Sequence, residues 1–230
     1  MTAILAFDCA VSGLDVAVLR GGSRLAGLAQ DGRDQAAQLL PAIETVLAKA
    51  GVERRDLELV AVTIGPGSFT GVRVGLAAAR GLAVGLGVPL AGISTTSVLL
   101  GQAAPRSRLV VAAIDSRLGD WFCAIGGIPS DGAETAAFVA TARELATRLE
   151  GRACHLVGTG TKVLSEQLLA AGVEVTAEEA VPDAVTLGRL AARDGVEAWR
   201  MRNRLEGLPR PLYLRGVNIT LPDGARRTVD

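Results

Sequence analysis

The first third of the chain alternates short apolar runs with turn residues. Apolar runs over 2–10, 14–22 and 24–31 predict three short strands joined by tight turns. Helical spacing of the apolar residues over 34–51, which end at a glycine, predicts an amphipathic helix. The run over 57–65 is almost continuously apolar, so it predicts a strand that is buried on both faces.

The pattern then repeats. RLVVAAIDSRLGDWFCAIGG, from Arg108, has the layout of AILAFDCAVSGLDVAVLRGG, from Ala3: apolar strand, Asp, short polar turn, second strand. Asp115 takes the place of Asp8. We therefore predict two similar α/β halves with mixed sheets, divided in the segment QAAPRS. The expected units are 1–104, 105–217 and an irregular tail over 218–230.

The remaining elements follow from the same periodicities. We expect helices over 71–86, from 95, over 141–149, 161–172 and 183–201, and strands over 89–94, 154–160 and 173–176. The segment 81–105 carries no charge and is long enough to span a bilayer. Pro89, five glycines and the polar STTS divide it, so we expect helix, strand and helix, and no membrane span.

Composition narrows the class of protein. Hydrophobic residues make up 49% and charged residues 21%, which is typical of a folded chain. The formal net charge is zero, so no global charge attracts nucleic acid or an anionic membrane. Asp8 follows the apolar start too early for a signal peptide. The cysteines Cys9, Cys123 and Cys154 are odd in number and lie in apolar runs, which predicts buried thiols in a cytoplasmic protein.

The segment GPGSFTGVRVG, over 65–75, lies between a strand and a helix, where phosphate-binding loops occur. Gly65 and Gly67 allow close backbone approach, and Ser68 is placed to cap the next helix. The segment matches neither the Walker motif nor G-x-G-x-x-G. Two interpretations stay open: a structural tight turn, or a nucleotide phosphate contact by Gly65, Gly67, Ser68 and the strand-end Asp8.

Other candidate chemistry is sparse. Asp115 either faces a phosphate or metal or caps a turn. His155 is the only histidine and lies in an apolar run, so we expect a core residue, no metal site and no catalytic residue set. An arginine-rich stretch either contacts RNA phosphates or, as we prefer, is a solvated helix end; it comprises Arg200, Arg202, Arg204, Arg210 and Arg215.

Small residues recur every fourth position in the helix after the glycine loop. One series is Gly71, Gly75 and Ala79, and a second is Ala77, Gly81 and Gly85. Small residues at helical spacing permit another helix to approach closely. We therefore add a protein partner to the hypotheses.

These segments together resemble one family. ILAFDCAVSGLDVAVL, QLLPAIETVLAKAG, GPGSFTGVRVGLAAARGLAVGLGVPLAGISTTSVL, AIDSRLGDWFCAI, GTGTKV and PRPLYLRGV are similar to the bacterial TsaB family, also called YeaZ. The resemblance covers the chain to about Val217. Many relatives have a histidine before the first helix, in H-S-x-x-L-L-P, where this chain reads DQAAQLLP.

The resemblance implies an ASKHA fold, the actin-like fold with two duplicated, ribonuclease-H-like subdomains. It implies a non-catalytic scaffold that pairs with TsaD, and with the ATPase TsaE, to form N6-threonylcarbamoyladenosine beside the anticodon of tRNA. It implies no firm cofactor, with ATP or ADP bound only in the assembled complex. It implies that the heterodimer with TsaD replaces a weaker homodimer of similar geometry; the sequence leaves open whether the chain alone is a homodimer or a monomer.

The partner surface expected from the resemblance lies on the helices over 38–49 and 71–86. Its candidate residues are Leu39, Leu40, Ile43, Gly71, Gly75 and Ala79. Two other functions stay open. One is an ASKHA small-molecule kinase or nucleotide-binding protein, which needs intact phosphate loops. The other is a peptidase, which needs a metal-ligand set or a catalytic dyad, and this sequence offers neither of those two.

Overall fold

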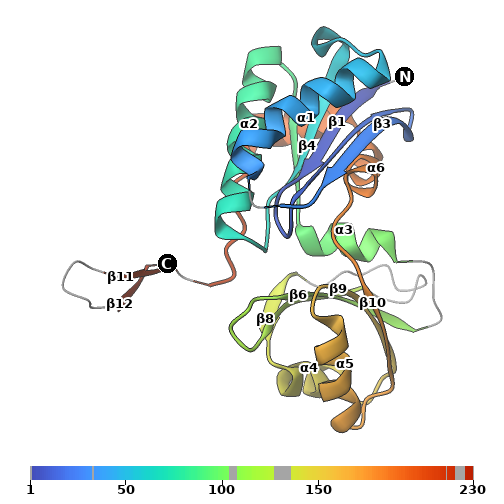
Figure 1. Cartoon of the computed structure of the whole chain (residues 1–230), viewed down its shortest axis with the longest axis vertical. Coiled ribbons are helices and arrows are strands. Elements are labelled where there is room, and N and C mark those ends of the chain that lie inside the picture. The colour runs from blue at the N-terminus through green and yellow to red at the C-terminus, as the bar shows by residue number, and fades with distance from the viewer. Residues whose placement is uncertain are drawn as a thin grey trace.

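The computed structural model describes residues 2–32, 34–103, 108–126, 136–215, 217–220 and 226–229. Two five-stranded mixed sheets, each with its own helices, lie one above the other in Figure 1. This arrangement agrees with the two similar α/β halves that the repeated strand pattern predicts.

The first sheet has the strand order β3-β2-β1-β4-β5. Its strands are β1 (Ala3–Asp8), β2 (Leu14–Arg20), β3 (Ser23–Gln30), β4 (Leu57–Thr63) and β5 (Leu90–Ile93). β1 pairs antiparallel with β2 and parallel with β4. Helices α1 (Gln35–Ala50) and α2 (Phe69–Leu86) cover one face, and a short 3-10 turn, η1 (Arg54–Asp56), precedes β4.

The second sheet repeats this topology in the order β10-β9-β6-β7-β8. Its strands are β6 (Leu109–Asp115), β7 (Trp121–Gly126), β8 (Phe138–Ala140), β9 (Cys154–Gly158) and β10 (Val175–Glu179). Helices α4 (Ala142–Leu149) and α5 (Thr161–Ala170) share its buried apolar cluster. β6, β9 and α5 thus correspond in order to β1, β4 and α2.

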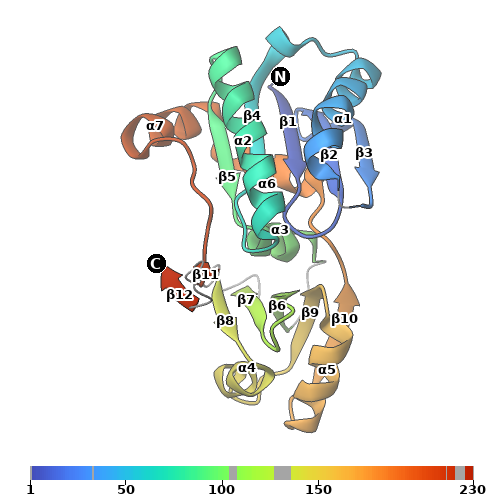
Figure 2. The same ribbon diagram turned by 60° about the vertical axis from the view of Figure 1, so that its left-hand side comes forward.

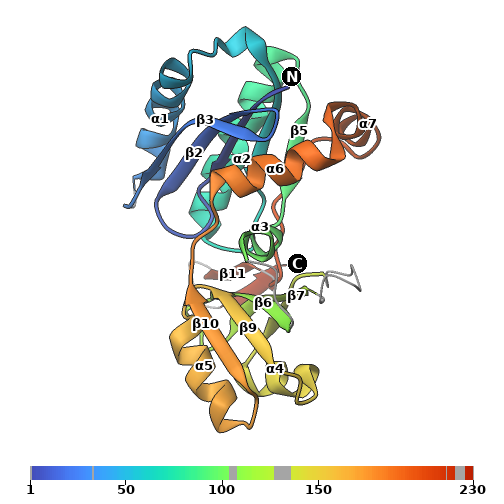
Figure 3. The ribbon, with the colours of Figure 1, turned by 90° about the vertical axis from the view of Figure 1, so that its right-hand side faces the viewer.

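The two halves exchange a helix. α3 (Thr95–Gln102) follows β5 but packs on β6 and β7 of the second sheet. α6 (Ala184–Asp194) follows β10 but packs on β1 and β2, and its Leu187 and Ala191 share a buried cluster with Ile4 and Ala6. Figure 3 shows α6 running along the first sheet. The expected units 1–104 and 105–217 thus each contain a helix that packs on the sheet of the other unit.

The long helix expected over 183–201 is two helices. The chain turns at Gly195, with φ at 84°, between α6 and α7 (Val196–Glu206). The Trp199 indole of α7 donates a hydrogen bond of 2.9 Å to the Ala191 carbonyl of α6 and shares its buried cluster. A single straight helix would carry Trp199 away from this cluster.

The tail also differs from the expectation. β11 (Val217–Thr220) and β12 (Arg226–Val229) form an antiparallel pair in the segment expected to be irregular. In Figures 1 and 2 this pair lies beside the body of the molecule, near the level at which the two halves meet. The uncharged segment 81–105 contains the end of α2, then β5 and α3, so the expected helix–strand–helix order is confirmed.

Candidate functional site

A cavity of about 720 Å³ lies where the turns of the two halves meet. The first half contributes the turn after β1 and the glycine loop before α2. The second half contributes the turn after β6 and the turn between β9 and α5. The lining includes Ala10, Val11, Ser12, Gly67, Ser68, Thr70, Ile114, Asp115, Ser116, Arg117, Phe122, Thr159 and Gly160. Because the turns follow corresponding strands, each half presents equivalent elements to the cavity.

The glycine loop packs closely against its own chain. A Cβ on Gly67 would lie 2.1 Å from the Ala10 carbonyl oxygen, and one on Gly71 would lie 1.9 Å from that of Cys9. The Ser68 amide donates a 2.6 Å hydrogen bond to the Ala10 carbonyl, and the Gly71 amide donates to Ser68 Oγ at 3.2 Å. Gly67 and Gly71 thus permit this close approach. A phosphate at Ser68 would have to compete with these internal acceptors.

Asp8 is held inside the first half. It is 3% exposed and is not among the residues that line the cavity. Its Oδ1 accepts hydrogen bonds from Thr63 Oγ1 and from the Ala10 amide, the latter at 3.1 Å. Burial raises the pKa of Asp8 to about 7, against the lowering effect of these two hydrogen bonds, and the nearby Asp15 raises it further. This carboxyl group is part of the interior.

Asp115, at the equivalent strand end, lies differently. It is exposed and lines the cavity. Its Oδ1 accepts the Arg117 amide at 2.7 Å, and its own amide donates to Thr159 Oγ1 at 3.1 Å. Asp115 therefore caps its turn and also lines the cavity. That it faces a phosphate or a metal stays a prediction.

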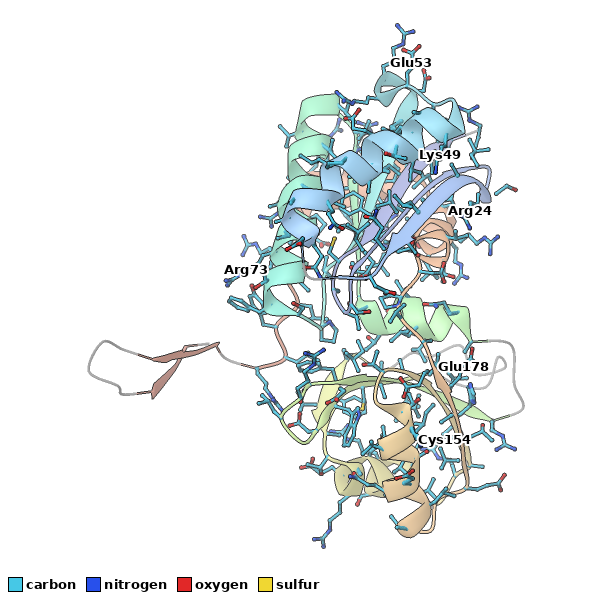
Figure 4. The ribbon with its side chains drawn as sticks, in the orientation of Figure 1. Arg24, Lys49, Glu53, Arg73, Cys154 and Glu178 are labelled. Carbon is cyan, nitrogen blue, oxygen red and sulfur yellow. The ribbon has the colours of Figure 1, made fainter. Side chains whose placement is uncertain are left out.

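The sulfur and imidazole groups lie in the interior. Cys9, Cys123 and Cys154 are free and buried, and burial raises the pKa of the Cys123 thiol to about 12 and that of Cys154 to about 11. Figure 4 labels Cys154 inside the second half. His155 is 3% exposed and its Nδ1 lies 2.9 Å from Thr176 Oγ1. Among the described residues, no three His, Cys, Asp or Glu side chains are grouped to hold a metal ion.

Most of the expected partner-surface residues face the core. Five of the six candidates are buried: Leu39, Ile43, Gly71, Gly75 and Ala79. Only Leu40 is exposed, at 53%. A Cβ on Gly75 would meet Cys9 Cβ and Val62 Cγ2 at 3.5 Å, so this glycine faces its own sheet.

The second small-residue series faces outward instead. Ala77, Gly81 and Gly85 are exposed, and a Cβ on either glycine would meet nothing within 4 Å. Val84 beside them is 70% exposed. By length and composition alone, α2 is the single helix in the described part of the chain that could cross a membrane, and 33% of that window is buried. Its outer surface thus presents the small and apolar residues Ala77, Gly81, Val84 and Gly85.

The segment 208–215, here called the strap, is a feature that sequence reasoning missed. The Leu212 amide donates to the Ile64 carbonyl at 2.7 Å, and Arg73 Nε donates to Tyr213 Oη at 2.8 Å. Tyr213 also stacks on Phe69, with 5.7 Å between ring centroids. Figure 4 labels Arg73 at the end of α2 that lies toward the second half. At its end, Arg215 forms an ion pair with Asp120 of the second half, so the strap connects the two halves beside the cavity.

The arginine-rich stretch is largely engaged within the chain. Arg200 pairs with Glu197, and Arg202 pairs with Asp194 at 2.9 Å and lies over the Trp199 ring. Arg215 pairs with Asp120 as described above, so three of the five arginines form ion pairs with acidic residues of this chain. These contacts favour the interpretation as a helix end over a surface for RNA phosphates.

Known proteins are similar to this chain in sequence and in fold. The family described as TsaD, tRNA N6-adenosine threonylcarbamoyltransferase, matches residues 30–215. The Escherichia coli K12 protein described as tRNA threonylcarbamoyladenosine biosynthesis protein TsaB is 37% identical over 124 residues. That match covers 53% of each protein, so the chain spans about half the length of this curated relative.

Two solved structures are informative. A Pseudomonas aeruginosa protein described as similar to the peptidase YeaZ has a TM-score of 0.74 at 27% identity, over 94% of this chain and 100% of that one. A hexokinase of the ROK class from Thermus thermophilus has a TM-score of 0.50 at 14% identity, over 82% of this chain and 97% of that one. The second likeness concerns the fold alone, and it agrees with the ASKHA architecture. The chain belongs to the family of tRNA N6-adenosine threonylcarbamoyltransferase-like proteins that its residues 30–215 match, and within it to the TsaB (YeaZ) proteins.

Proposed function

We propose that this protein takes part in forming N6-threonylcarbamoyladenosine in tRNA, as a non-catalytic subunit that binds a TsaD-like protein. Membership of the family supports participation in this pathway, and the exposed outer surface of α1 and α2 supports a role as a binding subunit. Leu40 of α1 is 53% exposed there, and Val84 of α2 is 70% exposed beside the exposed series Ala77, Gly81 and Gly85. Exposed apolar surface of this kind on a folded protein commonly marks a binding site.

The small residues indicate how the partner would bind. Because Gly81 and Gly85 have open space above them, a helix of the partner can approach the α2 backbone closely. We infer that α1 and α2 pack against an equivalent helix pair of TsaD as a four-helix bundle, and that a homodimer through the same surface competes with it. A TsaE-like ATPase and tRNA would join through the complex. The buried free thiols support a cytoplasmic location for this complex.

Reconstitution tests the role. The purified chain, a TsaD-like subunit and a TsaE-like ATPase are incubated with tRNA and threonylcarbamoyl-adenylate, and the modified nucleoside is measured by mass spectrometry. We expect product only when this chain and the TsaD-like subunit are both present. Product from this chain alone would contradict a non-catalytic role.

A matched pair of variants tests the surface. Val84→Glu places a charge on the outer face of α2, and we expect it to weaken TsaD binding at least tenfold with an unchanged melting temperature. Val163→Glu makes the same change at a residue of α5 that is 51% exposed, and should bind as the parent does. Equal binding by the parent and Val84→Glu would place the partner elsewhere.

The cavity between the halves favours one alternative, a nucleotide-binding protein or small-molecule kinase. Its volume of about 720 Å³ and its two facing strand–helix turns suit a phosphorylated ligand. In the scaffold interpretation, ATP or ADP binds there only in the assembled complex. Turnover of ATP by the isolated chain would favour the kinase.

A further inference from the structure

The N-terminus of α5 is occupied by a carboxylate from another strand. Glu179, the last residue of β10, accepts the Gly160 amide through Oε2 at 3.2 Å. Its Oε1 accepts Thr161 Oγ1 at 2.9 Å and the Lys162 amide at 3.2 Å. The first amides of a helix have no partner within the helix, and they attract anions. Glu179 thus fills the position that an anion takes at such an end.

This helix end corresponds to the glycine loop of the first half. The turn between β9 and α5 is the counterpart of the turn between β4 and α2, and both line the cavity. A Cβ on Gly158 would lie 1.9 Å from the Ala113 carbonyl oxygen, much as one on Gly67 would meet Ala10. In the first half the Ser68 amide is paired with the Ala10 carbonyl. In the second half the first amides of α5 donate instead to the side chain of Glu179, which can be displaced.

A buried indole lies at the same turn. Trp121 is 4% exposed, and its Nε1 has no hydrogen-bond partner in the described part of the chain. This nitrogen lies 3.2 Å from the position that a Cβ on Gly160 would take, beside the Asp115 side chain. A buried indole N–H usually has a partner, and Gly160 brings no side chain against this one. The donor therefore suits an anion oxygen at this turn.

We propose that the N-terminus of α5 is a latent phosphate-binding site that the Glu179 carboxylate holds closed. Glu179 is exposed, so it can be displaced without unfolding a core. It directly precedes the segment 180–183, which leads to α6 on the first sheet. A tethered carboxylate competes with free anions at an effective concentration of about millimolar or more. The intact protein therefore binds phosphoryl groups poorly at this turn.

Anion titrations of single variants test the proposal. Inorganic phosphate and magnesium-ADP are titrated separately into the parent, Glu179→Ala and Glu179→Gln, by calorimetry and by tryptophan fluorescence. We expect Glu179→Ala to bind both probes at least about tenfold more tightly than the parent, with a fluorescence change from the adjacent Trp121. Glu179→Gln, which keeps an acceptor oxygen without the charge, should show a smaller gain.

Further variants distinguish binding at this site from an effect of the net charge of the protein. Glu166→Ala removes one exposed carboxylate from the same helix and should bind as the parent does. Asp115→Asn combined with Glu179→Ala should increase the affinity further, because Asp115 is the other carboxylate at this turn. Thermal melts accompany every titration, and Glu179→Gln decides the question if Glu179→Ala does not fold.

Three results would overturn the proposal. Folded Glu179 variants that bind phosphate no more tightly than the parent would leave Glu179 as a helix cap only. An equal gain in Glu166→Ala would assign the effect to net charge. A gain for magnesium-ADP without one for phosphate would place the contact at the base or ribose, away from α5.

Discussion

Thr63 donates a hydrogen bond from its Oγ1 to Oδ1 of Asp8, and both side chains lie on the face of the first sheet that α6 covers. Asp15 stands opposite Asp8 across the β1–β2 pair and accepts the first amide of α6 at 3.1 Å. Burial raises the pKa of both carboxyl groups, most clearly that of Asp8, to about 7. The end of β1 therefore carries a proton near neutral pH.

This proton predicts how stability depends on pH. Between about pH 4 and pH 7 the folded protein keeps a proton on Asp8 that the unfolded chain has lost. The free energy of unfolding therefore falls as pH rises through this window, by up to roughly 1.4 kcal/mol per pH unit. Asp8→Asn removes this contribution. We expect urea unfolding curves at pH 5 and pH 7 to differ less for Asp8→Asn than for the parent.

The matched control is Asp115→Asn, at the equivalent but exposed end of β6. It should retain the pH dependence of the parent, including the contribution of Asp15. An unchanged pH dependence in Asp8→Asn would show that Asp8 is already ionised in the folded protein at pH 5.

Much of the fold followed from the periodicity of the sequence, because a strand–Asp–turn–strand pattern that occurs twice indicates a duplicated unit. The exchange of α3 and α6 could not be predicted in this way. An amphipathic helix reveals that it has a buried face, but its sequence does not say which sheet covers that face. The break at Gly195 had a local signal, since a glycine within a helical pattern often ends the helix.

The candidate site, like the fold, could be predicted from the sequence only in part. Gly75 and Gly81 belong to two small-residue series with identical spacing, and the spacing does not distinguish the inward from the outward series. The contacts of Gly75 with Cys9 and Val62 show that its series is the one that faces inward. The role of Glu179 was also beyond the sequence, because β10 brings it to α5 through pairing with β9.

Leucine substitutions at the two glycines should therefore act on different properties. Gly75→Leu adds a branched side chain between α2 and the sheet, and overpacking of this kind costs about 1–3 kcal/mol. Gly81→Leu adds it in open space, so the fold should keep its stability while TsaD binding weakens. Thermal melts and a binding assay on the same samples check both. A folded, fully stable Gly75→Leu would contradict the inward placement.

Asn203 protects the edge strand of the first sheet. Its Oδ1 accepts the Leu90 amide at 2.7 Å, and its Nδ2 donates to the Leu90 carbonyl at 3.0 Å, as a neighbouring strand would. Asn203→Ala leaves the buried backbone of Leu90 without these bonds, which should cost about 1–3 kcal/mol. Chemical unfolding measures the loss, and hydrogen exchange should accelerate at the Leu90 amide. Arg204→Ala, at an exposed neighbour on α7, should change neither.

The last prediction compares one substitution at two glycines. Gly92 of β5 lies under the strap, and a Cβ there would stand 2.5 Å from Pro209 Cβ and 2.8 Å from Ile64 Cγ2. Because Arg80 donates to the Pro209 carbonyl at 3.1 Å, the strap cannot shift without disturbing that bond. Gly92→Ala should therefore destabilise the fold by about 1–3 kcal/mol and expose the strap to proteolysis. Gly81→Ala, in open space within a helix, should instead stabilise the fold by roughly 0.5–1 kcal/mol. If both variants gain stability, the strap does not pack on β5 in solution.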